Sequence, residues 1–288
     1  FAVVDPKTLS IEQWENGDNR KLEKLPPRQE ALTVTCGVYR GNNPTWKCAG
    51  VAIPVFSLRS EESFGIGDFA DLKKMVDWAV LTGQRVVQLL PVNDTTMTHT
   101  WTDSYPYNAN TIFALHPLYL SLSVFGSFKS KAINAFIDTK QKELNALPEV
   151  DYEAVAGAKW QIYRVAYKEQ AAKTLKSATY KEFVDQNSEW LYPYCVFCYL
   201  RDKYQTVDFH QWEQYAIYRP EFIKELCDKN SEAYEEASIH CFLQYHLHCQ
   251  LKEASDYARS KGVILKGDIP IGVSPNSVEA WTEPHLFN

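Results

Sequence analysis

The sequence lacks several features that would point to whole classes of protein. No apolar run approaches the roughly 20 residues that a membrane-spanning helix needs, so we expect no membrane partner. Acidic residues outnumber basic ones by 36 to 30, which gives a net charge of −6, and the basic residues are dispersed. Because nucleic-acid binding depends on concentrated Lys and Arg, we expect no nucleic-acid partner either.

The chain also starts without the features of a natural beginning. Residues 1–5 (FAVVD) contain neither an initiator Met nor the basic segment of a signal peptide. We therefore expect this sequence to be an internal piece of a longer protein.

The cysteines form no framework. There are seven, an odd number at irregular spacing, which is typical of free thiols in a reducing compartment, so we expect a cytoplasmic protein. Cys195 and Cys198 have CxxC spacing, but their flanks are apolar and no second pair follows. One predicted helix is crowded with possible metal ligands: His240, Cys241, His246, His248 and Cys249. Because His246 falls on the buried stripe of that helix, we do not expect these residues to bind a metal. We expect no cofactor either.

Aromatic residues are plentiful, at 14% of the chain. Most of them should pack in the core, but such a content also suits a protein that binds sugars. The C–H face of a sugar ring packs on an aromatic face, and its hydroxyls need polar partners.

Residues 1–48 read as β structure and turns. Residues 31–39 (ALTVTCGVY) are rich in strand-forming residues and follow the turn-forming Leu25-Pro26-Pro27. The loop RGNNP at residues 40–44 closes this part, so we place a domain boundary at residues 48/49.

The next segment predicts a parallel strand–helix–strand unit. Residues 51–58 (VAIPVFSL) suit a strand that is buried on both faces, and residues 85–90 (RVVQLL) suit a second strand that ends at Pro91. Between them we expect a helix that is capped by Asp68 and ended by Gly83. Its apolar residues recur at helical spacing: Phe69, Leu72, Met75, Val76, Ala79 and Val80.

A third strand of this type is predicted only at residues 262–273 (GVILKGDIPIGV), after an amphipathic helix over residues 239–258. The intervening residues, about 92–262, are mostly helical by pattern and should form an inserted subdomain. Strands that alternate with helices favour a doubly wound sheet or a (β/α)8 barrel. Three strands, where a barrel needs eight, indicate part of an α/β barrel.

Polar residues follow two of these strands, where a barrel presents its active face. The loop DSYPYN at residues 103–108 comes after the second strand, and Asp268 ends the third. Asp268 could bind sugar hydroxyls or serve as a structural carboxylate. Tyr107 could be a sugar platform or simply pack the loop.

Several segments resemble the amylomaltase family of 4-α-glucanotransferases in order and spacing. They are SL at residues 57–58, GIGD at 65–68, QLLP at 88–91, DSYPY at 103–107, and GDIPIGV at 267–273 followed by Ser277 and Trp281. The resemblance covers about residues 50–288, and the DSYPY form is similar to the subtype with appended starch-binding modules. It implies the N-terminal part of a (β/α)8 catalytic domain that acts on α-1,4-glucans and maltooligosaccharides.

A second resemblance concerns residues 14–20 (WENGDNR), which are similar to a segment near the end of family-20 starch-binding modules. The resemblance implies that Trp14 stacks on glucose rings and that residues 1–48 are the C-terminal part of a β-sandwich module. The alternative for Trp14 is a buried strand tryptophan.

The family resemblance also implies a retaining mechanism with two carboxylates about 5 Å apart. Its motifs place a nucleophile in Arg-x-Asp-His, an acid/base in Glu-Asp-Leu-Gly and a third Asp after Thr-His. None of these motifs occurs here, and Thr98-His99 leads to Thr100. We therefore expect no catalytic residue in this chain, which should be inactive by itself.

The resemblance instead implies substrate contacts at Tyr107, Asp268 and Ser104. Two other functions stay open, a non-catalytic glucan-binding protein and an α-amylase-type hydrolase, although GDIPIGV favours the transferase over the hydrolase.

Overall fold

The computed structural model describes residues 2–18 and 47–287, which fall into two compact units, Phe1–Lys47 and Cys48–Asn288. The described part of the first unit is a hairpin of β1 (Ala2–Val4) and β2 (Ile11–Trp14), which pair antiparallel. The Asp5 carboxylate accepts the backbone N–H of Lys7 at 2.7 Å and so fixes the turn between them. The strand expected at residues 31–39 lies outside the described residues.

The second unit contains a three-stranded parallel sheet in the order β3–β4–β5. The strands are β3 (Gly50–Ala52), β4 (Val86–Gln88) and β5 (Ile264–Lys266). Helix α1 (Asp71–Leu81) connects β3 to β4, and α6 (Tyr234–Ser260) leads into β5. The predicted strand–helix–strand unit and the third parallel strand are thus confirmed, but the third strand ends at Lys266, so its prediction as far as residue 273 is wrong.

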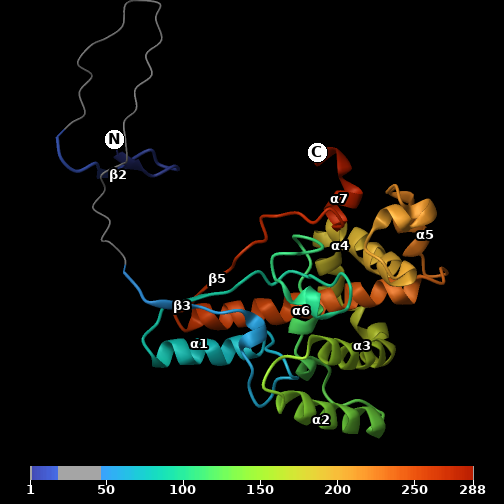
Figure 1. Cartoon of the computed structure of the whole chain (residues 1–288). Coiled ribbons are helices and arrows are strands. Elements are labelled where there is room, and N and C mark those ends of the chain that lie inside the picture. The colour runs from blue at the N-terminus through green and yellow to red at the C-terminus, as the bar shows by residue number, and fades with distance from the viewer. Residues whose placement is uncertain (1, 19–46, 288) are drawn as a thin grey trace, which may run out of the picture. The chain divides into compact units, whose positions relative to one another are not determined.

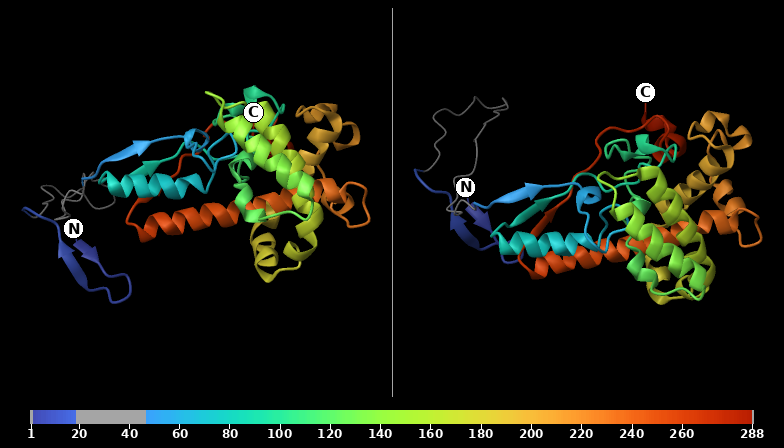
Figure 2. Two further views of the ribbon diagram at one scale, coloured as in Figure 1. Left: turned by 90° about the horizontal axis from the view of Figure 1, so that it is seen from below. Right: turned by 60° about the horizontal axis from the view of Figure 1, so that its bottom comes forward.

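Helices α1 and α6 cover one face of this sheet (Figures 1 and 2). In the register of the sheet, Val51, Val87 and Leu265 form a row across the three strands; Val87 is buried in the core beneath, and the other two are partly buried against it. Their neighbours along the strands point to the opposite face, where Ile264 is half exposed. The prediction that the first strand is buried on both faces is therefore wrong for the described residues of this unit.

That first strand is also shorter than predicted. The Ile53 N–H still donates to the Gln88 carbonyl at 2.8 Å, but Pro54 has no N–H to continue the ladder. A 3₁₀ turn, Val55–Ser57, follows at once. Pro54 therefore ends the strand within the apolar run.

Asp68 does not cap α1, which begins three residues later at Asp71. The Asp68 carboxylate accepts the backbone N–H groups of Ala70 and Asp71 in a buried turn before the helix. Asp71 in turn accepts the hydroxyls of Ser60 and Ser63. At the other end, Gly83 has φ +73°, a left-handed conformation that glycine adopts without strain, and it ends α1 as predicted.

The long segment between β4 and β5 is helical, as expected. The remaining helices of the unit are α2 (Lys131–Asn145), α3 (Tyr152–Thr174), α4 (Ala178–Tyr204), α5 (Glu221–Leu226) and α7 (Val278–Thr282). Short 3₁₀ turns lie at Trp101–Ser104, Pro117–Tyr119, Leu122–Phe125, Phe209–Gln211, Glu213–Tyr215 and Pro284–Leu286. None of the helices in residues 2–18 and 47–287 combines the length and apolar character that a membrane crossing requires.

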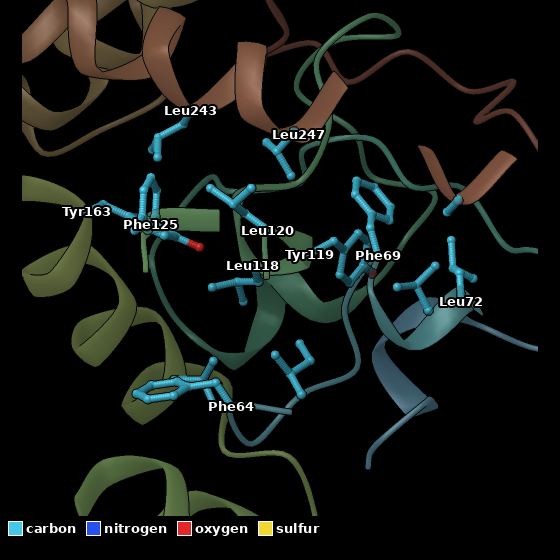
Figure 3. Close-up of a cluster of buried hydrophobic side chains, with 14 of the residues drawn as sticks. Phe64, Phe69, Leu72, Leu118, Tyr119, Leu120, Phe125, Tyr163, Leu243 and Leu247 are labelled. Carbon is cyan, nitrogen blue, oxygen red and sulfur yellow. The ribbon is translucent and has the colours of Figure 1, made fainter. Parts of the chain in front are cut away.

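One apolar core joins the sheet to the insertion. Figure 3 shows side chains from α1, α3 and α6 meeting around the segment 118–125. Lys159 of α3 is fully buried there and donates to the carbonyls of Leu118 and Leu120 at 2.6 and 2.9 Å. Burial lowers the pKa of Lys159 to about 8. These two bonds hold the segment that returns from the site loop described below.

A second core lies inside the insertion. Trp281 of α7 packs against Phe197 of α4 and against Trp212, and its indole N–H donates to the Tyr215 carbonyl at 2.9 Å. The 27-residue helix α6, about 40 Å long at the usual rise, borders both cores. The segment after β5 is thereby attached to the helices inserted before it.

Candidate substrate-binding site

The candidate site lies at the carboxyl end of the sheet, where the segments that follow β4 and β5 approach each other. The Tyr107 hydroxyl donates to Asp268 Oδ2 at 2.8 Å, although 161 residues separate the two. Asp268 Oδ1 accepts the backbone N–H of Ile269 at 3.0 Å. The bond to Asp268 and burial raise the pKa of Tyr107, so the phenol is neutral and the carboxylate is its acceptor. Tyr107 and Asp268, which were both predicted as site residues, are therefore joined by a hydrogen bond.

Tyr107 and Asp268 are both partly exposed, so a ligand can reach them. The ring of Tyr105 lies 5.7 Å from that of Tyr107 at an angle of 50°, and its side chain is 61% exposed. On the open face of the sheet nearby, Lys266 Nζ donates to Gln88 Oε1 at 3.0 Å. The arrangement offers aromatic faces beside hydrogen-bonding groups, as sugar recognition requires.

Ser104 and Trp14 lie elsewhere. Ser104 is partly exposed at the end of the 3₁₀ turn before Tyr105, and its hydroxyl makes no hydrogen bond within the described chain. Trp14 lies on β2 of the first unit and is 65% exposed. Among the described residues of this unit, the Trp14 side chain is thus largely exposed.

Asp103 organises the start of the site loop from within. Its buried carboxylate accepts the backbone N–H groups of Thr98 and His99 at 3.1 and 2.7 Å and the Thr98 hydroxyl at 3.0 Å. His99 has φ +60°, which these bonds hold in place. Hydrogen bonds within the loop itself therefore fix the start of the segment that carries Tyr107.

A second buried carboxylate, Asp94, ties the loop to the insertion. It accepts the Tyr194 hydroxyl at 2.7 Å, the Thr96 N–H at 2.9 Å and the Asn110 amide at 3.1 Å. Burial alone would raise the pKa of Asp94, but interactions with His116, Arg201 and Thr96 outweigh it and hold that pKa below its ordinary value. A charged carboxylate in the interior therefore joins both ends of the loop to α4.

Two further contacts bind the loop to the chain after β5. The Val278 N–H donates to the Asn110 carbonyl at 2.7 Å, and the Thr111 hydroxyl donates to Glu279 at 2.6 Å. Arg201 of α4 donates to the Thr96 carbonyl at 2.7 Å.

The residues that hold the site, Asp94, Asp103, Arg201 and Glu279, were not predicted. Asp94 and Asp103 follow a barrel-type strand and Asp103 opens the DSYPY motif, but neither signal separates a scaffold carboxylate from a ligand-binding one.

The cysteine-rich helices carry no assembled metal site within residues 2–18 and 47–287, where no group of three or more possible ligands comes together. The six described cysteines are free thiols. Cys195 and Cys198 are buried, and burial raises the pKa of both. Cys195 Sγ lies 2.7 Å from Cys241 Sγ of α6.

Comparison with known proteins bears on this geometry. The profile of a family described as 4-alpha-glucanotransferase matches residues 53–288, which include the sheet, the insertion and both site segments. The chain belongs to the 4-alpha-glucanotransferase family.

Relatives in this family are substantially longer. The chain is 42% identical to the 4-alpha-glucanotransferase DPE2 of Oryza sativa subsp. japonica over 96% of this chain and 29% of that protein. It is 34% identical to the 4-alpha-glucanotransferase of Chlamydia caviae over 83% of this chain and 44% of that protein. The chain therefore spans about a third to a half of the length of these family members.

Solved structures confirm the fold. The amylomaltase of Streptococcus agalactiae in complex with acarbose superposes with a TM-score of 0.68 at 24% identity, over 84% of this chain and 47% of that one. The amylomaltase of Corynebacterium glutamicum gives a TM-score of 0.63 at 19% identity, over 81% and 32%. The family member described here thus has a partial, strongly helical α/β barrel fold.

Proposed function

We propose that this chain is the substrate-binding portion of a 4-α-glucanotransferase that moves α-1,4-glucan segments between maltooligosaccharides or glycans and a glucose-type acceptor. The observation that carries the proposal is the contact between Tyr107 and Asp268 at the carboxyl end of the sheet. Membership of the family and the names of the relatives support the reaction class. The retaining carboxylates come from parts of the protein outside this sequence, which contains none of their motifs.

In this proposal each candidate residue has a role. The Tyr107 ring is a platform beside the cleaved bond, since its face is reachable while its hydroxyl is held by Asp268. Asp268 contacts sugar hydroxyls at the same subsite, and Ser104 makes a secondary contact. The protein acts in the cytoplasm, as its odd number of unpatterned cysteines suggests.

The test is the disproportionation of maltotriose by the full-length protein that contains this sequence. Tyr107→Ala removes the ring, so we expect transfer to fall by orders of magnitude. Tyr107→Phe keeps the ring and loses one partly exposed hydrogen bond, so it should cost less than about tenfold. Transfer produces maltopentaose together with glucose, whereas hydrolysis produces maltose and glucose, and the products therefore also separate the two reactions.

Tyr257→Ala is the matched control. Tyr257 also donates its hydroxyl to a carboxylate, Asp77, but it lies on α6 before β5 begins, away from the carboxyl end of the sheet. This variant should transfer at the normal rate. A normal rate for Tyr107→Ala, with thermal stability unchanged, would show that the Tyr107 ring only packs the loop.

We further propose that residues 1–48 are the C-terminal part of a starch-binding module, in which the exposed ring of Trp14 stacks on glucose. Trp14→Ala should weaken retention of the full-length protein on insoluble starch and leave maltotriose turnover unchanged. Equal retention of the wild-type protein and the variant would remove Trp14 from the glucan-binding surface.

A further inference from the structure

The insertion contains a cavity of about 440 Å³ that is open to solvent on one side and shares no lining residue with the site described above. Its walls come from α3, α4 and α6 and from the segment that follows α5. This volume lies in the range of about 300–1,000 Å³ that is typical of small-molecule sites. The cavity is therefore large enough for a ligand of its own.

Tyrosine dominates the wall of this cavity. The Tyr167 hydroxyl is bonded to the Ser238 hydroxyl. Tyr180, Tyr192 and Tyr234 also line the cavity, and their hydroxyls make no hydrogen bond within the described residues. Tyr180 is buried, whereas Tyr192 and Tyr234 are partly exposed, so these three phenols offer ring faces and reachable hydroxyls to a ligand that carries hydroxyl groups.

The charge of the lining is entirely positive. Lys176 and Lys229 contribute to the wall, and neither forms an ion pair in the part of the chain that the structure describes. No Asp or Glu is among the lining residues. Burial raises the pKa of the Cys227 thiol to about 12, so this side chain adds no negative charge at neutral pH. Both lysines are exposed, so they lie where the cavity opens to solvent, and two ammonium groups with no carboxylate in the lining favour a negatively charged ligand there.

We propose that this cavity binds a hexose monophosphate. The phosphate pairs with Lys176 and Lys229, and the sugar hydroxyls bond the unpartnered tyrosine hydroxyls while the ring packs on a tyrosine face. A neutral glucan would make no use of the two ammonium groups, and inorganic phosphate would make no use of the tyrosine rings and hydroxyls. A ligand that combines a sugar and a phosphate contacts both parts of the wall.

The experiment is isothermal titration calorimetry of the full-length protein with glucose 1-phosphate, glucose and inorganic phosphate. Glucose 1-phosphate should bind more tightly than either of the other two. Lys176→Ala and Lys229→Ala should each weaken it about tenfold, and Tyr234→Phe should weaken it through loss of a single hydroxyl. The control is Lys181→Ala, an exposed lysine of α4 outside the cavity, which should bind normally.

A Tyr107→Ala variant should also bind glucose 1-phosphate normally, which separates the cavity from the glucan site. The proposal would be overturned by the absence of binding or by equal affinity for inorganic phosphate or glucose. Wild-type affinity in the Lys176→Ala/Lys229→Ala double variant, or loss of binding in Tyr107→Ala, would also overturn it.

Discussion

The bond between Tyr194 and Asp94 should control both the stability of the insertion and the position of the loop that carries Tyr107. Tyr194 is fully buried on α4, and its hydroxyl lies 2.7 Å from the buried Asp94 carboxylate. Tyr194→Phe removes only that hydroxyl and keeps the ring in the core, so no large cavity forms.

The magnitude follows from the contacts of Asp94. Hydrogen bonds to charged groups contribute about 1.5–3 kcal/mol, and Asp94 retains Thr96 and Asn110 as donors in the variant. We therefore expect Tyr194→Phe to lower the free energy of unfolding by about 1.5–3 kcal/mol. If the whole loss of free energy acts on the ordering of the loop, the fraction of molecules with the correct loop conformation decreases by at most about 10- to 150-fold. Maltotriose transfer should fall by an amount within that limit.

The assay combines urea unfolding of the full-length protein with maltotriose transfer. Asp94→Asn and the double variant complete a mutant cycle, in which we expect a coupling energy of about 1–2 kcal/mol because the two groups share one bond. Tyr199→Phe is the control, since Tyr199 is on the same helix and its hydroxyl makes no hydrogen bond within the described residues.

Two results would refute this reasoning. An unfolding free energy for Tyr194→Phe within about 0.5 kcal/mol of wild type would mean that Asp94 does not depend on this donor. The expected loss of stability with a normal transfer rate would mean that the bond supports the insertion but does not position the site loop.

Three further predictions follow from the sequence and the buried groups. Residues 1–288 alone should release no glucose from maltotriose above a buffer blank, whereas the full-length protein should do so; clear turnover by the isolated chain would contradict our assignment of the catalytic acids. Thiol titration of the unfolded chain should count seven free thiols, and stoichiometric zinc in elemental analysis would overturn the prediction of no metal. Burial lowers the pKa of His240 from 6.5 to about 4. The unfolded state therefore binds more protons between those values, and the free energy of unfolding should fall by up to about 3 kcal/mol as the pH drops from 6.5 to 4. The His240→Gln variant should show a shallower pH dependence in urea unfolding, and an unchanged slope would mean that His240 does not titrate as a buried group.

Much of the fold could be predicted from local sequence pattern. The apolar stripes predicted α1 and the body of α6, because helical burial repeats with the period of the helix itself. Gly83 ended α1 as expected, since its positive φ is a local requirement. The details that failed were also local: Pro54 shortened β3, and Asp68 formed a turn ahead of α1 and did not cap it.

The candidate site could be predicted only in part. The sequence by itself determined that Tyr107 and Asp268 follow two parallel strands, and parallel strands deliver their ends to one edge of a sheet. Only the tertiary structure decided that the two side chains bond each other across 161 residues, and that Tyr194 reaches Asp94 across 100. The tyrosines that line the cavity of the insertion likewise come from separate helices, and its two lysines come from the segments between helices. The physical reason is that such contacts depend on how the helices of the insertion pack against the loop. The short-range periodicity of the sequence does not predict that packing.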